Sequence, residues 1–146
     1  MGQLIKTICQ ECLDEQSYVF GIGQSYLAIT TNMLLGDLNW LEEQVSQSTF
    51  KAIKELSQKH KKEEFPSIPG LQCDFSAELF ECKNCNTVET HNDIKITFDD
   101  EETYQVEWNC DECKALQTIT TKPITKYACK KCGSTLLKET GRGIWD

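Results

Sequence analysis

Long apolar runs and export signals are absent from this sequence. Its longest apolar stretches, such as Tyr26 to Ile29, fall far short of the roughly 20 residues that a membrane-spanning helix needs. The first six residues, Met1 to Lys6, have no extended apolar region and no small-residue cleavage site, so we expect no secretory signal. Only three prolines occur and 26% of the residues are charged, which favours a folded, soluble protein over a disordered one. We therefore expect a cytoplasmic protein.

Motifs that would indicate an enzyme are also missing. The chain has only two histidines, neither with an evident nucleophile partner, and it has no Gly-rich phosphate loop and no His-Glu-x-x-His helix. Its carboxylates gather in a solvated run, Asp99 to Glu102, rather than in an isolated pair. The sequence therefore predicts no catalytic activity.

Cysteine, in contrast, is abundant. Eight of the nine cysteines form four Cys-x-x-Cys pairs: Cys9/Cys12, Cys82/Cys85, Cys110/Cys113 and Cys129/Cys132. This spacing lets one tight turn present two sulfurs to one ion, and two such turns complete a tetrahedron. Where thiols stay reduced, four pairs indicate metal ligation rather than disulfides. We predict two structural zinc ions; a thioredoxin-like redox motif, disulfides and an iron–sulfur cluster are the alternatives.

The sharing of the pairs between the two ions is less constrained than the metal. Adjacent pairs favour Cys110, Cys113, Cys129 and Cys132 as one site, which leaves Cys9, Cys12, Cys82 and Cys85 for the other. A cross-brace, in which alternate pairs share an ion, is the alternative. Metal sites would supply stability that a chain with 39% hydrophobic residues lacks, so each site should fold only when zinc is bound.

Strand patterns flank a central helical pattern. Residues 3–29 alternate as strands around the first cysteine pair, with Gly21 and Gly23 expected in a turn. Apolar residues from Leu38 to Leu56 repeat as one helical face, and a break near Gly36 or residues 47–49 divides the helix in two. Short β-like runs follow at residues 79–80, 94–98, 104–108, 117–121 and 135–137, and Asp99 to Glu102 is expected as a hairpin loop. The expected fold is α+β: two small β zinc ribbons, with a helical insertion between the halves of the first. The expected domains are 1–92, with the insertion at about 31–64, and 93–146.

The chain resembles the zinc-ribbon class, and especially small uncharacterised bacterial proteins that begin with a strand, a Cys-x-x-Cys turn and a Gly-x-Gly turn before a helical insert. The residues that carry the resemblance are Ile5 to Cys12, Tyr18 to Gly23, Cys82 to Cys85 and Cys129 to Gly133. Only Cys132 is followed by the glycine common in such turns, whereas Leu13, Asn86 and Lys114 occupy the other three positions. The resemblance implies a fold and a metal but no single function.

The remaining chemically notable residues have ordinary structural interpretations. We expect Cys73 to be a buried inert thiol among apolar neighbours. His60 and His91 are expected at the surface, and Trp40 and Trp108 in the core; Trp145 stands apart because only Asp146 follows it.

The charge pattern suggests two classes of partner. The net charge is −8, yet residues 114–142 carry seven basic residues against one glutamate, after an acidic stretch at residues 88–113. The leading hypothesis is a non-catalytic protein-binding adaptor or regulator, with the helical segment as a docking face and homo-oligomerisation through it as one version. The alternative is a nucleic-acid-binding ribbon. Its candidate binding residues are Lys122, Lys126, Lys130, Lys131 and Arg142. If the basic stretch has no binding role, we expect it to pair with the acidic hairpin of the same chain.

Overall fold

The computed structural model describes residues 2–23, 38–60, 72–98 and 102–145, and its chain divides into two compact units. The first unit contains residues 1–23, 77–91 and 107–146, and the second contains residues 24–76 and 92–106. The predicted boundary at residues 92/93 does not coincide with this division. The reason is that the last strand of the chain pairs with the first, which places the two ends of the sequence in one unit.

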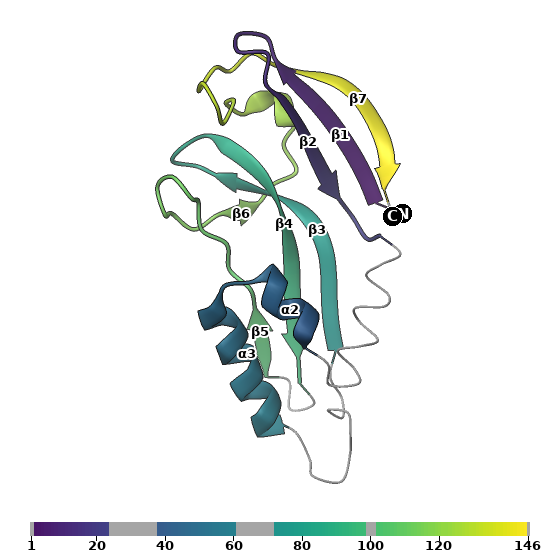
Figure 1. Cartoon of the computed structure of the whole chain (residues 1–146), viewed down its shortest axis with the longest axis vertical. Helices are drawn as coiled ribbons and strands as arrows, with labels where there is room; N and C mark the ends of the chain where they lie inside the picture. Colours follow the sequence, from purple (N-terminus) through teal and green to yellow (C-terminus); the bar gives the residue numbers. More distant parts are fainter. Residues whose placement is uncertain (1, 24–37, 61–71, 99–101, 146) are drawn as a thin grey trace. The chain divides into compact units, whose positions relative to one another are not determined.

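A three-stranded antiparallel sheet in the order β2-β1-β7 lies in the first unit (Figure 1). Its strands are β1 (Gly2–Cys9), β2 (Glu15–Phe20) and β7 (Leu137–Trp145). The β1–β7 register runs from Gly2 opposite Trp145 to Cys9 opposite Leu137, with an irregularity between Lys6 and Thr7. The sequence predicted β1 and β2, but it indicated only the beginning of β7.

A second sheet has the order β5-β4-β3-β6 and contributes to both units. Its strands are β3 (Gln72–Cys82), β4 (Thr87–Thr97), β5 (Thr103–Gln105) and β6 (Thr118–Ile119). β4 and β5 pair antiparallel, as expected for a hairpin, although residues 99–101 of its predicted loop lie outside the described residues. Gly21, expected in a turn, instead forms an antiparallel bridge with Ala77 of β3.

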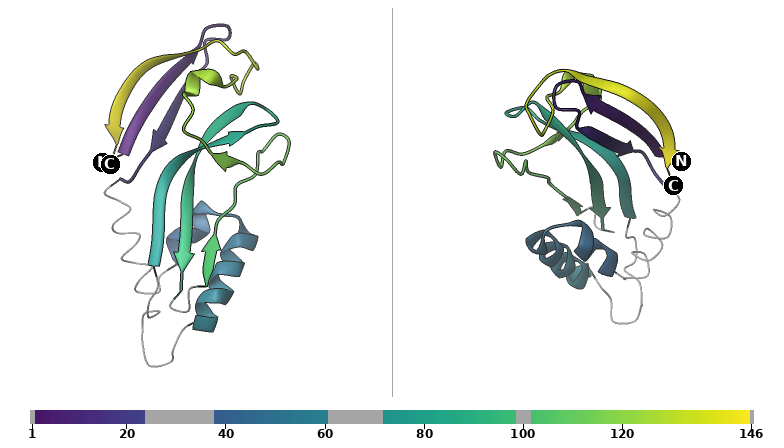
Figure 2. Two further views of the ribbon diagram at one scale, coloured as in Figure 1. Left: turned by 180° about the vertical axis from the view of Figure 1, so that it is seen from behind. Right: turned by 45° about the horizontal axis from the view of Figure 1, so that its top comes forward.

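The second unit contains both described helices, α2 (Asn39–Gln44) and α3 (Gln47–His60). Ser46 separates them: its Oγ accepts a hydrogen bond from the amide of Thr49, as an N-cap does. This break confirms the one predicted near residues 47–49, whereas residues 31–37 and 61–64 of the predicted helical segment lie outside the described residues. The end of α3 lies beside the β4–β5 hairpin (Figure 2), where His60 stacks on Phe98 at 4.4 Å.

Each unit has its own small core. In the first unit, a cluster of buried side chains is covered by Ile5 and Phe20; its members are Tyr18, Leu79, Val88, Ile124 and Tyr127. In the second unit, the buried residues include Leu41 of α2, Ile53 of α3, and Ile94 and Ile96 of β4. The described helices include none that is long and apolar enough to cross a membrane.

The indole of Trp145 closes the first sheet at the chain ends. Its Nε1 donates a hydrogen bond to the carbonyl of Phe20 at 3.3 Å. The indole lies where a Cβ at position 2 or 23 would be, and a Cβ at Gly23 would come within 2.7 Å of the ring. Glycine at these two positions therefore makes room for the last aromatic residue of the chain.

We predict that Gly23→Ala destabilises the protein by about 1–3 kcal/mol, because the added methyl group overlaps the Trp145 ring. Chemical denaturation followed by tryptophan fluorescence measures the change. Gly143→Ala is the matched control, since a Cβ there meets Leu4 at an ordinary 3.6 Å. Equal effects of the two substitutions would contradict the packing described for Trp145.

Candidate metal centres

The eight paired cysteines form two separate groups of four, both in the first unit. The outer site consists of Cys9, Cys12, Cys129 and Cys132. The inner site consists of Cys82, Cys85, Cys110 and Cys113. The outer site is named for the first and fourth Cys-x-x-Cys pairs of the sequence, and the inner site for the second and third pairs, which lie between them. Cys9 and Cys82 are the last residues of β1 and β3, so strand ends position the first sulfur of each site.

The predicted sharing of the pairs is wrong. The first pair joins the fourth and the second joins the third, which is neither the predicted arrangement nor the cross-brace. The sheets explain the difference. β1 pairs with β7, which brings Cys9 and Cys12 beside the turn just before β7. β3 pairs with β6 up to Glu81 opposite Thr118, and the bridge between Asn109 and Leu116 holds the Cys110–Cys113 turn just before β6.

The sulfur positions fit a tetrahedral ion. A zinc–sulfur distance of about 2.3 Å implies sulfurs about 3.8 Å apart at the corners of a tetrahedron. In the outer site, the sulfur of Cys9 lies 3.6 Å from that of Cys132, and the sulfur of Cys12 lies 3.7 Å from that of Cys129. In the inner site, the Cys82–Cys113 and Cys85–Cys110 sulfurs are 3.4 and 3.9 Å apart. A disulfide needs about 2.05 Å, so these distances match ligation rather than bridges.

All four turns use the same backbone conformation after their second cysteine. Leu13, Asn86 and Lys114 have φ of 60°, 54° and 63°, and Gly133 has φ of 75°. The amide of this left-handed residue donates a hydrogen bond to the carbonyl of the first cysteine in the turn. Examples are Leu13 to Cys9 at 2.9 Å and Gly133 to Cys129 at 2.8 Å. Three turns therefore adopt a left-handed conformation without the glycine that favours it. Only the turn of Cys129 and Cys132 has the glycine that is typical of such turns in a sequence.

The thiols in each site oppose one another's ionisation. The amide of Cys12 donates a hydrogen bond that lowers the pKa of the Cys9 thiol to about 6, and the amide of Ala115 similarly lowers the pKa of Cys113 to about 7. The hydrogen bond with Cys113 is the largest of several effects, burial among them, that raise the pKa of Cys85 to about 12. Four thiolates cannot share such a site alone, and a divalent cation would resolve the conflict.

The histidines depart from the predicted surface positions. The His60 side chain is 8% exposed, and its Nε2 lies 2.7 Å from Glu102 Oε2. His91 stacks on Trp108 with ring centroids 4.5 Å apart, and its Nε2 lies 2.9 Å from Gln117 Oε1. Each ring thus stacks on an aromatic side chain and lies within hydrogen-bond distance of a polar one. Each sulfur group among the described residues is complete with four cysteines, and neither histidine belongs to one.

The other singled-out residues are only partly buried. Cys73 is half-buried rather than buried, although burial still raises the pKa of its thiol to about 12. Trp40 and Trp108, expected in the core, are also half-buried. The ring of Trp40 meets Phe75 edge-on at 5.1 Å.

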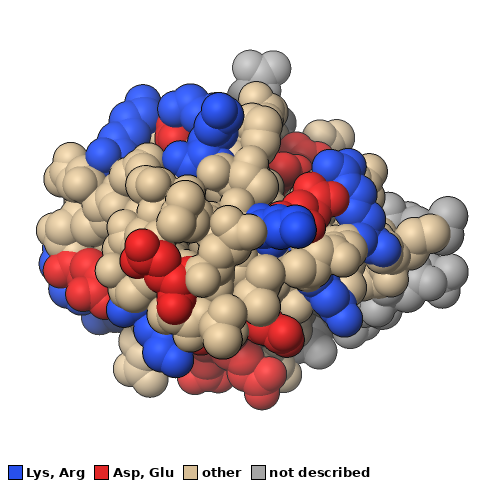
Figure 3. Space-filling view, turned by 90° about the horizontal axis from the view of Figure 1, so that it is seen from above, with Lys and Arg blue, Asp and Glu red and all other residues tan. Residues whose placement is uncertain are grey.

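The candidate nucleic-acid-binding residues lie on the first unit, and four of the five pair with acids of that same unit. Lys122 pairs with Glu81, Lys130 with Glu89, Lys131 with Asp14, and Arg142 with Glu139. Lys126 is exposed at the end of η1 (Ile124–Lys126). The predicted pairing with the acidic hairpin falls mostly outside the described residues, because residues 99–101 are not described; within the second unit, Glu102 pairs with Lys59 and His60. Figure 3 accordingly shows basic side chains in separate groups with acidic side chains beside them.

A pocket that the sequence did not predict lies in the first unit, with a cavity volume of about 380 Å³. Its apolar walls come from Ile5, Phe20, Leu79 and Ile124. These residues are far apart in the sequence and belong to four different segments, so no local pattern could have indicated them.

The comparisons with known proteins give no relative: no family model, no curated protein and no solved structure matches the chain. The two four-cysteine groups are compatible in geometry with zinc-ribbon sites.

We predict two tightly bound zinc ions per chain, because each group offers four sulfurs at ligand spacing. Elemental analysis of protein purified without added metal should find this stoichiometry. The double variant Cys9→Ser/Cys129→Ser should lose one ion, since both ligands belong to the outer site. The control double variant Cys9→Ser/Cys82→Ser should lose both ions. Iron with visible colour would contradict the assignment of zinc. Loss of two ions in the first variant and of one ion in the control would contradict the sharing of the cysteine pairs.

We also predict opposite effects of glycine at two equivalent turns. Leu13→Gly should stabilise the zinc-loaded protein by about 0.5–1 kcal/mol, because it relieves a left-handed conformation that costs about 1–2 kcal/mol. Gly133→Ala should destabilise it by about 1 kcal/mol through backbone strain alone, since nothing lies within 4 Å of the added Cβ. Denaturant unfolding at saturating zinc measures both changes. Effects of the same sign would show that the turns are not equivalent.

Proposed function

We propose that this protein is a non-catalytic adaptor or regulator whose two structural zinc ions hold a β scaffold that binds a protein partner. The observation that carries the proposal is the pocket of the first unit, a concave site whose walls come from elements tied together by the two cysteine groups. The four sulfurs of each group would fill a tetrahedral zinc ion and leave no position for water or substrate, which supports a structural role for the metal.

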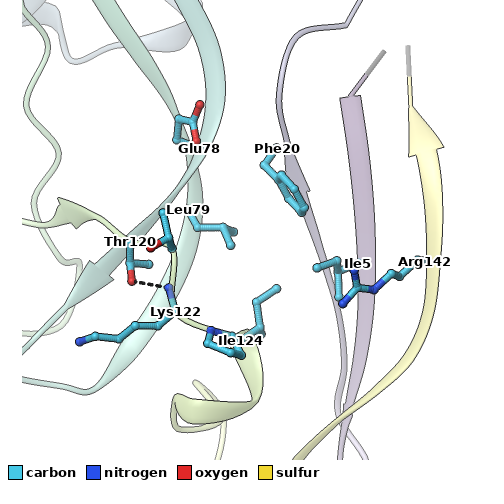
Figure 4. Close-up of a pocket in the computed structure, with 10 residues that line it drawn as sticks. Ile5, Phe20, Glu78, Leu79, Thr120, Lys122, Ile124 and Arg142 are labelled. Carbon is cyan, nitrogen blue, oxygen red and sulfur yellow. Dashed lines mark hydrogen bonds between the residues drawn. The ribbon is translucent and has the colours of Figure 1, made fainter.

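The pocket is formed by apolar side chains that converge from two directions. Figure 4 shows Ile5 and Phe20 on one side, facing Leu79 and Ile124 on the other. Leu79 and Ile124 are buried, whereas Ile5 and Phe20 are only partly covered. Its volume lies within the range of sites that enclose small ligands or a few side chains of a peptide. An apolar side chain of a partner would therefore complete this wall of residues.

The charges around the pocket indicate the chemistry of the partner. The guanidinium of Arg142 lies beside Ile5, whereas the side chain of Lys122 points away from the pocket (Figure 4). Arg142 pairs with Glu139 but is 69% exposed, so a second carboxylate can reach it. A planar guanidinium is well suited to hold a carboxylate with two hydrogen bonds. We therefore propose that the occupant is a peptide segment with an apolar residue next to an acidic one.

The pocket replaces the helical segment as the proposed docking site. Ile53, on the apolar face of α3, is buried within the second unit, and so is Leu41 of α2. The part of the apolar helical face that these residues form is therefore already used in packing.

Nucleic-acid binding remains the second candidate, favoured by the seven basic residues between 114 and 142. The ion pairs of Lys122, Lys130, Lys131 and Arg142 weigh against it, because a phosphate would have to compete with a carboxylate already beside each cation. The side chains of Lys122 and Lys131 are more than 60% exposed, so these pairs are weak individually and lower the local positive potential mainly through their number.

We predict that random peptides selected on the immobilised, zinc-loaded protein share an aliphatic or aromatic residue next to Asp or Glu. Arg142→Glu should weaken the binding of a selected peptide at least about tenfold, equivalent to about 1.4 kcal/mol. Phe20→Ser should weaken it too, by removing part of the apolar wall. Fluorescence anisotropy of a labelled peptide measures these affinities.

Lys131→Glu is the matched control, because Lys131 is similarly exposed and acid-paired but does not line the pocket. It should leave peptide affinity unchanged within twofold. Selection of peptides without a shared motif, or equal losses in Arg142→Glu and Lys131→Glu, would contradict the proposed site. Salt-sensitive binding of DNA or RNA near 0.15 M salt that is lost in Lys131→Glu would favour the second candidate.

A further inference from the structure

We infer that the outer and inner sites bind metal cooperatively and in a fixed order, the inner site first, through direct contacts between their cysteine turns. The inference depends on both groups binding a metal ion, but it does not depend on the identity of the partner or on the pocket.

A backbone hydrogen bond joins the two sites. The amide of Ala128 donates to the carbonyl of Asn86 at 2.7 Å. Ala128 immediately precedes Cys129 of the outer site, and Asn86 immediately follows Cys85 of the inner site. Ala128 is buried, so an unmade hydrogen bond there would leave a buried amide without a partner. The turn of one site is thus the hydrogen-bond partner of the other.

A buried polar contact forms a second link. The hydroxyl of Tyr127 donates to Glu81 Oε2 at 2.9 Å, and both residues are buried. Glu81 immediately precedes Cys82, and Tyr127 lies two residues before Cys129. Glu81 Oε2 also accepts a contact from Nζ of Lys122 at 3.1 Å, so the carboxylate has two partners. A buried carboxylate that loses one of its partners is destabilised, so order at one site favours order at the other.

A third link crosses between the same turns at the surface. Lys130, between the two cysteines of the outer turn, pairs with Glu89 of β4, four residues after Cys85. Glu89 also accepts a hydrogen bond from Gln117 at 2.8 Å, and Gln117 follows Cys113 by four residues. Glu89 therefore connects the outer turn with the segments that follow the two turns of the inner site.

The chain length between ligands sets the order. Cys85 and Cys110 of the inner site are 25 residues apart, whereas Cys12 and Cys129 of the outer site are 117 apart. The entropic cost of closing a loop grows as the logarithm of its length, so closure alone favours the inner site about tenfold. The filled inner site then holds Glu81, Asn86 and Glu89 in position to receive the outer turn.

The test uses Zn²⁺ alone, in competition with chelators of graded affinity. Cys129→Ser/Cys132→Ser leaves only the inner site, and Cys110→Ser/Cys113→Ser leaves only the outer site. These double variants are matched, because each removes one complete turn of its site. The inner-only protein should bind zinc about tenfold more tightly than the outer-only protein. The product of the two association constants of the unaltered protein should exceed the product of the single-site constants at least about fivefold.

Substitution of one tyrosine separates this coupling from general stability. Tyr127→Phe, made in all three proteins, removes the hydroxyl that reaches Glu81 and should lower the coupling factor towards one. Tyr18→Phe is the matched control: Tyr18 belongs to the same buried cluster, but its hydroxyl is adjacent to Thr7 of the neighbouring strand. The control should preserve the coupling factor.

Three results would overturn the inference. The first is that the product of the two association constants in the unaltered protein equals the product of the two single-site constants. The second is that the outer-only protein binds zinc more tightly than the inner-only protein. The third is that Tyr127→Phe and Tyr18→Phe lower the coupling factor equally. The stoichiometry of two ions and the binding of a selected peptide are measured separately, so a failure here is distinguishable from a failure of the proposed function.

Discussion

The meeting of the first and fourth cysteine pairs is the constraint on which the rest of the structure depends. Residues 9–12 lie against residues 129–132 at one end of the β1–β7 pair, and the two strands pair from there over their whole length. The sheet in turn forms one wall of the pocket with Ile5 and Phe20. A chain with two small cores has few other means of joining its ends, so a metal bound by these four sulfurs would carry a large share of the folding free energy.

The sulfur chemistry of each four-cysteine group favours a bound cation. Backbone amides lower the pKa of Cys9 and Cys113, whereas neighbouring sulfurs and burial raise the pKa of other thiols in the same groups. Without a cation, each group therefore favours one thiolate but not four. A divalent cation at the centre would make all four thiolates compatible, and each group would then act as a folding nucleus.

The sequence predicts local features of this protein well and long-range ones poorly. Cys-x-x-Cys spacing is local, so all eight clustered cysteines could be identified, as could β1, β2 and the break between α2 and α3. The sharing of the pairs depends on which strands become neighbours, and proximity in the sequence pointed to the wrong partners. β7 was largely missed because Gly141 and Gly143 interrupt its pattern. The left-handed turns at Leu13, Asn86 and Lys114 lacked the glycine that would have revealed them.

Charge counted along the sequence differs from the charge distribution in the fold. Residues 114–142 form a basic segment when counted along the chain, but the fold places Glu81, Glu89 and Asp14 beside three of its lysines. Glu81 and Glu89, next to the inner site, also contact residues next to the outer site: Glu81 accepts a hydrogen bond from Tyr127, and Glu89 pairs with Lys130. A phosphate that captured Lys130 would therefore have to break a contact between the metal sites. Lys130 contacts Glu89, whereas Arg142 pairs with Glu139 of its own strand and lines the pocket, which is why we propose Arg142 as the cation that meets a partner.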